Sequence, residues 1–158
     1  MLDLGRSFLA SVERDPHALA IVDSDVRLTY RDWYAKISSL VAAFDDLGLK
    51  PGERLVTVLQ NRWEAATVHW ACQFAGIIVT PLNWRAKPDE IDFGIDNAEG
   101  RALIFQDVSA AAVASAKAAA SLPRIAVNCP TASAFDFGEF VGTEAADATP
   151  RADAGPTR

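Results

Sequence analysis

The residues of this sequence best placed to bind a ligand are Asn83, Trp84 and Arg85, a polar stretch that follows an apolar run ending at Pro81. Open α/β sheets bind their ligands in loops at the carboxyl ends of parallel strands, and this stretch is expected to be such a loop. The alternative is structural, with Asn83 and Arg85 tying the backbone of the loop to the following helix. We favour the structural role, so none of the three is assigned as a binding residue.

Serines and paired acids offer no candidate for catalysis. Ser38 and Ser39 fall inside a predicted helix, outside the strand–turn–helix context of a nucleophile elbow and without a suitably placed His. Asp45 and Asp46 end a predicted helix, and we interpret them as solvated side chains. Three further acids begin the helix predicted from residue 88 onward, where the helix dipole favours negative charge: Asp89, Glu90 and Asp92. The sequence therefore assigns no catalytic residue.

Metal and redox chemistry require clustered ligands, and the sequence shows no such cluster. Cys72 and Cys129 are more than fifty positions apart, with neither a metal-ligand nor a redox-pair spacing. We expect both to be reduced core thiols, although the sequence leaves a disulfide between them open. His17 is isolated, and His69 is expected on the solvated face of a helix. No metal-binding residue is assigned.

A phosphate-binding loop is also missing from the sequence. Such a site directs the backbone N–H groups of a Gly-rich loop and a Lys at the phosphates, usually together with Mg²⁺. Neither a Walker motif nor a Gly-x-Gly-x-x-Gly follows a predicted strand. The lysines all lie outside Gly-rich loops; they are Lys36, Lys50, Lys87 and Lys117. We therefore assign no cofactor-binding residue and expect this chain alone to bind no cofactor.

Composition narrows the class of protein. The 158 residues suit one domain with a substantial core, and a hydrophobic content of 50% argues against global disorder. A net charge of −6 argues against binding to nucleic acid or to an anionic membrane surface. The sequence shows neither a signal-like leader nor an apolar run near the ~20 residues that span a bilayer, so we expect a cytoplasmic protein without membrane contact.

The first part of the chain predicts a helix, a hairpin and a second helix. Residues 4–12 repeat apolar side chains at helical spacing, and two short apolar runs around residues 23–25 predict the hairpin. Thr29 and Asp32 then form a capping-box pattern for a long helix that ends at Gly48.

The rest of the chain alternates strands and helices, which is the pattern of an α/β fold with a mostly parallel sheet flanked by helices. Predicted strands lie at 55–59, 77–80, 102–105 and 125–127, and predicted helices at 62–75, from 88 onward, and at 109–121, the last capped by Ser109. One short helix follows at 136–141. We therefore predict a domain at 1–141 and a disordered tail or linker at 142–158.

Three blocks, taken in order, resemble one family. The first is Leu-Thr-Tyr-Arg-Asp at 28–32, and the second is Gly-Leu-Lys-Pro-Gly-Glu-Arg-Leu-Val at 48–56. The third contains Pro-Leu-Asn-Trp-Arg at 81–85, followed by Pro-Asp-Glu at 88–90. Each block alone is common, but their order and separations resemble the early part of AMP-forming acyl-CoA synthetases, members of the adenylate-forming superfamily.

The resemblance implies the first subdomain of the large N-terminal domain of an AMP-forming carboxylic acid–CoA ligase. Such enzymes use ATP and Mg²⁺ to make an acyl-adenylate, from which the acyl group passes to coenzyme A. The phosphate loop and the later catalytic segments of the family lie beyond the matched region, so we expect a truncated chain that is inactive alone. Fatty and aromatic acids both stay open as substrates.

The alternative to a ligase fragment is a non-catalytic α/β module that binds or assembles while keeping the fold without the active site. In either case, surfaces that the complete ligase would cover are exposed here. We therefore expect a homo-oligomer or the remainder of the ligase as the partner, bound through exposed apolar surface.

Overall fold

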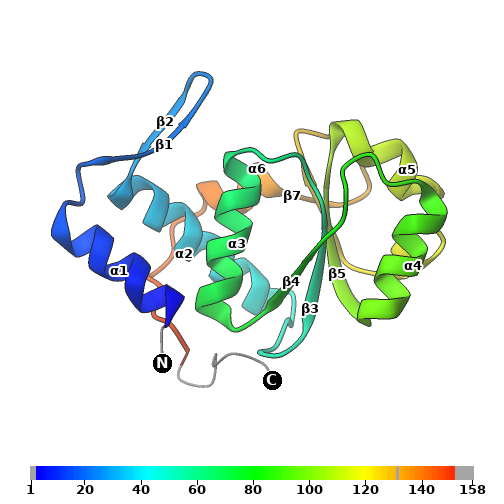
Figure 1. Ribbon diagram of the computed structural model, residues 1–158, viewed down its shortest axis with the longest axis horizontal. Helices are drawn as coiled ribbons and strands as arrows, with labels where there is room; N and C mark the ends of the chain where they lie inside the picture. The colour runs from blue at the N-terminus through cyan, green and yellow to red at the C-terminus, as the bar shows by residue number, and fades with distance from the viewer. Residues whose placement is uncertain (1–2, 131, 152–158) are drawn as a thin grey trace. The chain divides into compact units, whose positions relative to one another are not determined.

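The structure is a computed structural model that describes residues 3–130 and 132–151 in two units (Figure 1). The helical unit contains the described residues of Met1–Gly52, Asn61–Ile77 and Phe140–Arg158. The sheet unit contains the described residues of Glu53–Gln60 and Ile78–Glu139. Helix α6, Phe137–Gly142, passes from one unit to the other along the chain.

Five parallel strands form the sheet of the sheet unit, in the order β4-β3-β5-β6-β7. They are β3 Arg54–Val58, β4 Ile78–Pro81, β5 Gly100–Gln106, β6 Arg124–Val127 and β7 Phe135–Asp136. In register, Val56 pairs with Thr80 on one side and with Leu103 on the other. The predicted α/β class and parallel sheet are confirmed, and β7 is a strand that the sequence pattern did not predict.

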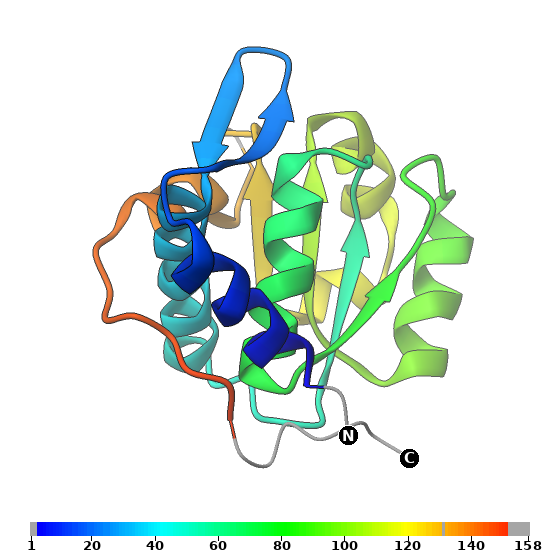
Figure 2. The ribbon, with the colours of Figure 1, turned by 60° about the vertical axis from the view of Figure 1, so that its left-hand side comes forward.

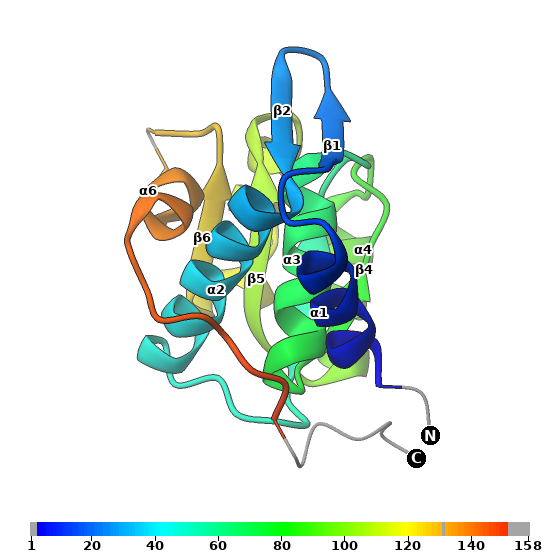
Figure 3. The same ribbon diagram turned by 90° about the vertical axis from the view of Figure 1, so that its left-hand side faces the viewer.

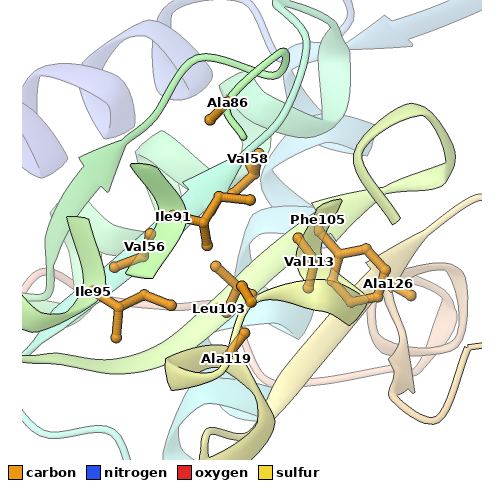
Figure 4. Close-up of a cluster of buried hydrophobic side chains, with 11 residues drawn as sticks. Val56, Val58, Ala86, Ile91, Ile95, Leu103, Phe105, Val113, Ala119 and Ala126 are labelled. Carbon is orange, nitrogen blue, oxygen red and sulfur yellow. The ribbon is translucent and has the colours of Figure 1, made fainter. Parts of the chain in front are cut away.

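One face of this sheet is packed by α4, Pro88–Ala98, with α5, Ala110–Ser115, and the 3₁₀ helix η2, Ala118–Ser121. Figure 4 shows Ile91 and Ile95 pointing from α4 toward Val56 and Leu103. Pro88 begins α4 as predicted, since its missing N–H would have no partner in the first turn. This packing holds in place the loops that follow β3, β4 and β5.

The Ala-rich stretch does not form the single helix predicted for 109–121. It forms η1, Asp107–Ser109, then α5 and η2, with Ala116 in an extended conformation between the last two. Asp92 of α4 accepts a hydrogen bond from the backbone N–H of Ala118 at 2.8 Å, which starts a new turn there. Ala116 and Ala119 are buried in the core cluster, so tertiary packing overrides the helix propensity of alanine.

Besides the end of α6, the described part of the helical unit contains three helices and a hairpin (Figure 2). They are α1 Leu4–Arg14, β1 Leu19–Asp23, β2 Val26–Thr29, α2 Tyr30–Asp46 and α3 Trp63–Ala75. Thr29 caps α2 as predicted, accepting a hydrogen bond from the N–H of Asp32 at 3.1 Å. Gly76 ends α3 in the left-handed conformation, at φ 73°. Figure 3 shows the hairpin projecting beyond the ends of the helices of this unit.

Aromatic rings form the centre of the helical unit. Phe8 of α1 lies with its ring centroid 5.3 Å from Trp33, 5.0 Å from Trp70 and 5.9 Å from Phe74. The Nε1–H of Trp33 also donates to the hydroxyl of Thr67 at 2.9 Å, joining α2 to α3. Phe8, Trp33 and Phe74 are buried, so these rings form a packed aromatic core.

Residues 143–151, which we predicted to be a disordered tail or linker, form neither helix nor strand but follow α2 closely (Figure 2). The backbone N–H of Ala148 donates to the hydroxyl of Ser38 at 2.9 Å, and the hydroxyl of Tyr34 donates to the carbonyl of Ala148. Residues 152–158 of the predicted tail lie outside the described part of the chain. No helix among the described residues is long and apolar enough to cross a membrane.

Candidate functional site

The carboxyl ends of the parallel strands lie at one edge of the sheet, where the loop after β4 contains the predicted candidate residues. The side-chain oxygen of Asn83 accepts from the N–H of Arg85 at 2.9 Å, and its carbonyl accepts from the N–H of Ala86 at 2.9 Å. These bonds form a tight Asx turn in front of α4. The geometry confirms the structural role that we favoured for Asn83.

Trp84 and Arg85 complete the same turn. The Arg85 guanidinium carbon lies 4.5 Å from the centroid of the Trp84 ring, a cation–π contact on the surface. The loop is anchored at its start, where the N–H of Leu82 donates to the carbonyl of Thr57 at 2.7 Å. The loop is thus held by its own residues and by β3, and it presents no cluster of groups aimed at one ligand atom.

Three polar side chains lie at this edge: Gln60, Gln106 and Ser109. Neither glutamine was singled out from the sequence, and Ser109, predicted to cap a helix, makes no side-chain capping bond to α5. The side-chain amide of Gln106 donates to Gln60 at 3.1 Å and accepts from the backbone N–H of Gln60. The hydroxyl of Ser109 donates to the carbonyl of Val58 at 2.8 Å and accepts from the N–H of Gln106 at 3.1 Å. A glutamine at the end of an apolar strand is the only sequence signal for this network.

This network leaves the edge poorly suited to ATP and Mg²⁺. Gln106 and Ser109 are buried, and their polar atoms bond to one another and to the chain. Among the described residues, no group of three or more His, Cys, Asp or Glu side chains could hold a metal ion. The residues present at this edge do not fit a nucleotide with its metal.

The remaining candidates from the sequence have structural roles. Ser39, like Ser38, bonds to the C-terminal segment, since its hydroxyl donates to the carbonyl of Thr143. Glu90 accepts from the N–H of Lys87 at 2.7 Å, which makes it part of a capping box. Asp45 forms an ion pair with Arg151. None of these groups lies beside a second reactive side chain.

Of the two cysteines predicted to be core thiols, only Cys72 is fully buried. Cys72 is buried in α3, and burial raises the pKa of its thiol, so the reactive thiolate is disfavoured. Cys129 is half-buried, and both cysteines are free thiols. His69 is exposed, as predicted for the solvated face of its helix, and His17 is exposed as well.

The hairpin is tied to the start of α3 by one carboxylate. Asp23 accepts from the side chain of Arg62 at 3.2 Å and from the backbone N–H of Trp63 at 3.0 Å. These donors lower the pKa of Asp23 below its ordinary value, the Arg62 bond contributing most. Asp23 thereby caps α3 from another element, which fixes the inner face of the hairpin against the helical unit.

The helical unit also has an open groove of about 710 Å³ between α2 and residues 141–147. Arg31, Lys36 and Ser39 of α2 line one side, with Ala35 between them. Arg31 is already paired with Asp147, its guanidinium donating at 2.7 and 3.1 Å to the two carboxylate oxygens. The groove mixes both signs of charge with small apolar groups, and it contains no nucleophile beside a base.

Comparisons with known proteins identify the family. The model of a family described as AMP-binding enzyme matches residues 8–156. A feruloyl-CoA synthase of an Amycolatopsis species is 30% identical over 110 residues, covering 70% of this chain and 22% of that protein. A 2-hydroxy-7-methoxy-5-methyl-1-naphthoate–CoA ligase of Streptomyces carzinostaticus is 28% identical over 105 residues, covering 66% of this chain and 19% of that protein. The chain thus spans about a fifth of the length of each ligase.

Solved structures share the fold. The benzoate CoA ligase from Burkholderia xenovorans superposes with a TM-score of 0.82 at 20% identity, over 100% of this chain and 31% of that chain. The N-terminal domain of a Mycobacterium tuberculosis protein, solved with an inhibitor, gives a TM-score of 0.83 at 20% identity, over 96% of this chain and 38% of that chain. The predicted resemblance is confirmed: the chain belongs to the AMP-binding enzyme family and has the fold of an N-terminal portion of its acyl- and aryl-CoA ligases.

Proposed function

We propose that this chain is an N-terminal scaffold portion of an AMP-forming carboxylic acid–CoA ligase and that it carries out neither adenylation nor thioester formation alone. The proposal rests on the carboxyl edge of the sheet, where hydrogen bonds join the side chains of Gln60, Gln106 and Ser109 to one another or to the backbone. An adenylating site needs free donors for phosphates and oxygen ligands for Mg²⁺ at such an edge. The family membership supplies the reaction class.

Substrate and cofactors belong to the complete ligase in this proposal. The relatives named for ferulate and for a naphthoate act on aromatic acids, which supports a carboxylic acid as the substrate class without selecting one acid. ATP and coenzyme A are proposed for the complete ligase, with Mg²⁺ as the metal. The free thiols of Cys72 and Cys129 support the proposal of a reducing, cytoplasmic location.

Calorimetry tests whether the chain binds nucleotide. The purified chain, shown to be folded by circular dichroism, is titrated with ATP-Mg²⁺ and with a nonhydrolysable acyl-adenylate mimic. A complete ligase of the family serves as the positive control for the reagents. We expect heat from the control and none from the folded chain. Saturable micromolar binding by the chain would overturn the proposal and direct mutagenesis to Asn83 and Arg85.

The alternative function, a non-catalytic assembly module, is favoured by one feature of the hairpin. Strand β1 contains a bulge between Leu19 and Ile21, after which Val22 pairs with Arg27. The bulge places Leu19 and Val22 on the same face despite their odd spacing. Their exposed fractions are 51% and 57%, so the outer face of the hairpin offers apolar surface to a partner.

Sedimentation velocity separates this alternative from a monomeric scaffold. A module that self-assembles through the hairpin should show a mass that rises with concentration, and Val22→Ser should restore the monomer. An unchanged monomeric mass up to about millimolar concentration would remove self-assembly from the alternative.

A further inference from the structure

One helix of the sheet unit presents a large aromatic side chain to solvent. Phe93 of α4 has an exposed fraction of 70%, whereas Ile91 and Ile95 on the opposite face are buried against the sheet (Figure 4). Because side chains three and four positions apart are neighbours on a helix, the ring of Phe93 lies among the side chains at those offsets. They are Asp89, Glu90, Asp96 and Asn97.

The charge around Phe93 has one sign. Neither Asp89 nor Asp96 forms an ion pair within residues 3–130 and 132–151. Glu90 caps the helix start but keeps its carboxylate at the surface. The exposed ring is therefore bordered by carboxylates that no cation of the described chain neutralises through an ion pair.

Helix stability accounts for only part of this pattern. Asp89 and Glu90 lie in the first turn of α4, where the positive end of the helix dipole favours them. Asp96 lies near the opposite end, where the dipole disfavours a carboxylate, and the last turn of α4 contains no basic residue. An exposed phenyl ring adds nothing to the core either. These two residues thus call for a role outside the folding of the sheet unit.

We propose that the outer face of α4, defined by Asp89, Phe93, Asp96 and Asn97, docks on a protein surface that has an apolar pocket bordered by Lys or Arg. Aromatic anchors that enter a pocket, surrounded by complementary charge, are a common design of protein interfaces. A second copy of this chain is a poor occupant, because two such faces would bring carboxylates together and each chain has a net charge of −6. With a basic partner, attraction replaces both the repulsion between facing carboxylates and the repulsion between net charges.

A synthetic helix tests the chemistry of the face directly. The probe is an amphipathic leucine/lysine peptide of about two heptads, titrated calorimetrically into the chain, with a scrambled peptide of the same composition as control. We expect micromolar binding of the amphipathic peptide and at least about tenfold weaker binding of the scrambled peptide. Equal binding of the two peptides, or no binding of the amphipathic one, would overturn the proposal.

Variants separate the aromatic anchor from the charge. Phe93→Ser should weaken binding about tenfold or more, and Phe93→Leu should keep most of it. Asp89→Asn with Asp96→Asn should weaken binding and flatten its salt dependence. Val108→Ser, which alters another exposed apolar side chain of the sheet unit, is the matched control and should bind as the unaltered chain does. Undiminished binding by folded Phe93→Ser would show attraction by charge alone and overturn the proposal.

Discussion

Ser38 and Ala148 are 110 positions apart in sequence, yet the hydroxyl of Ser38 accepts the backbone N–H of Ala148 at 2.9 Å. Both residues are buried, so this bond fastens an otherwise irregular segment to the middle of α2. Tyr34 acts on the same residue from one turn earlier, donating to the carbonyl of Ala148. The face of α2 that contains Ser38 could be mistaken for a catalytic serine site, but it holds the backbone of residues 143–151.

Ser38→Ala should lower the free energy of unfolding by about 1–3 kcal/mol, because it leaves the buried N–H of Ala148 without its acceptor. Urea denaturation measures the loss, and hydrogen exchange should show faster exchange within residues 143–151. Ser7→Ala, at an exposed position of α1, is the control and should change stability by less than about 0.5 kcal/mol. Equal effects of the two substitutions would contradict the attachment role of Ser38.

The pair of Arg31 and Asp147 should make the same segment sensitive to acid. The bond from Arg31 lowers the pKa of Asp147, so the pair stabilises the fold above the ordinary carboxyl pKa. That contribution disappears as the pH falls through the lowered pKa. Both side chains are about half exposed, at 46% and 53%, so the effect is small and weakened by salt.

Hydrogen exchange of residues 143–151, measured along a descending pH series and corrected for intrinsic rates, tests this dependence. We expect protection to fall in acid, and Asp147→Asn to remove that step while lowering protection at neutral pH. A step of the same size in the Asp147→Asn variant would assign it to another carboxylate.

Ser109→Ala should destabilise the chain by about 1–3 kcal/mol, because the hydroxyl satisfies the carbonyl of Val58 and the N–H of Gln106 in a buried setting. Thermal and urea unfolding measure the change. Ser115→Ala, at an exposed position at the end of α5, is the matched control and should be nearly neutral. If Ser109→Ala were equally neutral, the network at the carboxyl edge would contribute nothing to stability.

Gly48→Ala should cost about 1–2 kcal/mol through backbone strain alone, since Gly48 has φ +80° and an added Cβ would meet nothing within 4 Å. Gly48→Asn should cost less, because Asn tolerates the left-handed region better. Gly142→Ala, also in open space but outside the left-handed region, should be nearly neutral in the same denaturation experiment. Equal costs at the two glycines would exclude strain as the cause.

The two thiols should differ in reactivity with a maleimide. Cys129 is half-buried and should react first, whereas burial of Cys72 raises its pKa and limits both the thiolate and its access. In the Cys129→Ser variant, labelling of Cys72 should require unfolding and should therefore accelerate steeply with urea. Rapid labelling of Cys72 in buffer, at a rate insensitive to urea, would show that α3 opens locally.

Local signals predicted most of the fold. Thr29, Gly76 and Pro88 start or end their helices where the sequence predicts, because caps and turns depend on neighbouring residues. The continuous apolar run of β3 likewise indicated a parallel strand, and β3 pairs in parallel on both sides.

Long-range contacts explain what the sequence could not predict. The break in the Ala-rich stretch depends on Asp92, which reaches Ala118 from another helix. The course of residues 143–151 depends on partners more than a hundred positions away, and the segment has no periodicity of its own. At the candidate site, the structural role of Asn83 followed from its place before a helix, whereas the bond between Gln106 and Gln60 needs the strand order.

The attachment of residues 143–151 to α2 also sets an order of assembly during synthesis. Helices α1, α2 and α3 are complete by Ala75, but the N–H that the hydroxyl of Ser38 accepts belongs to Ala148. At typical translation rates the ribosome takes on the order of ten seconds to cover that interval. Throughout that interval, the hydroxyl of Ser38 lacks the N–H of Ala148 that it accepts in the folded chain. The helical unit begins first along the chain and is completed last, so its nascent form keeps part of the α2 surface uncovered while the sheet unit is being made.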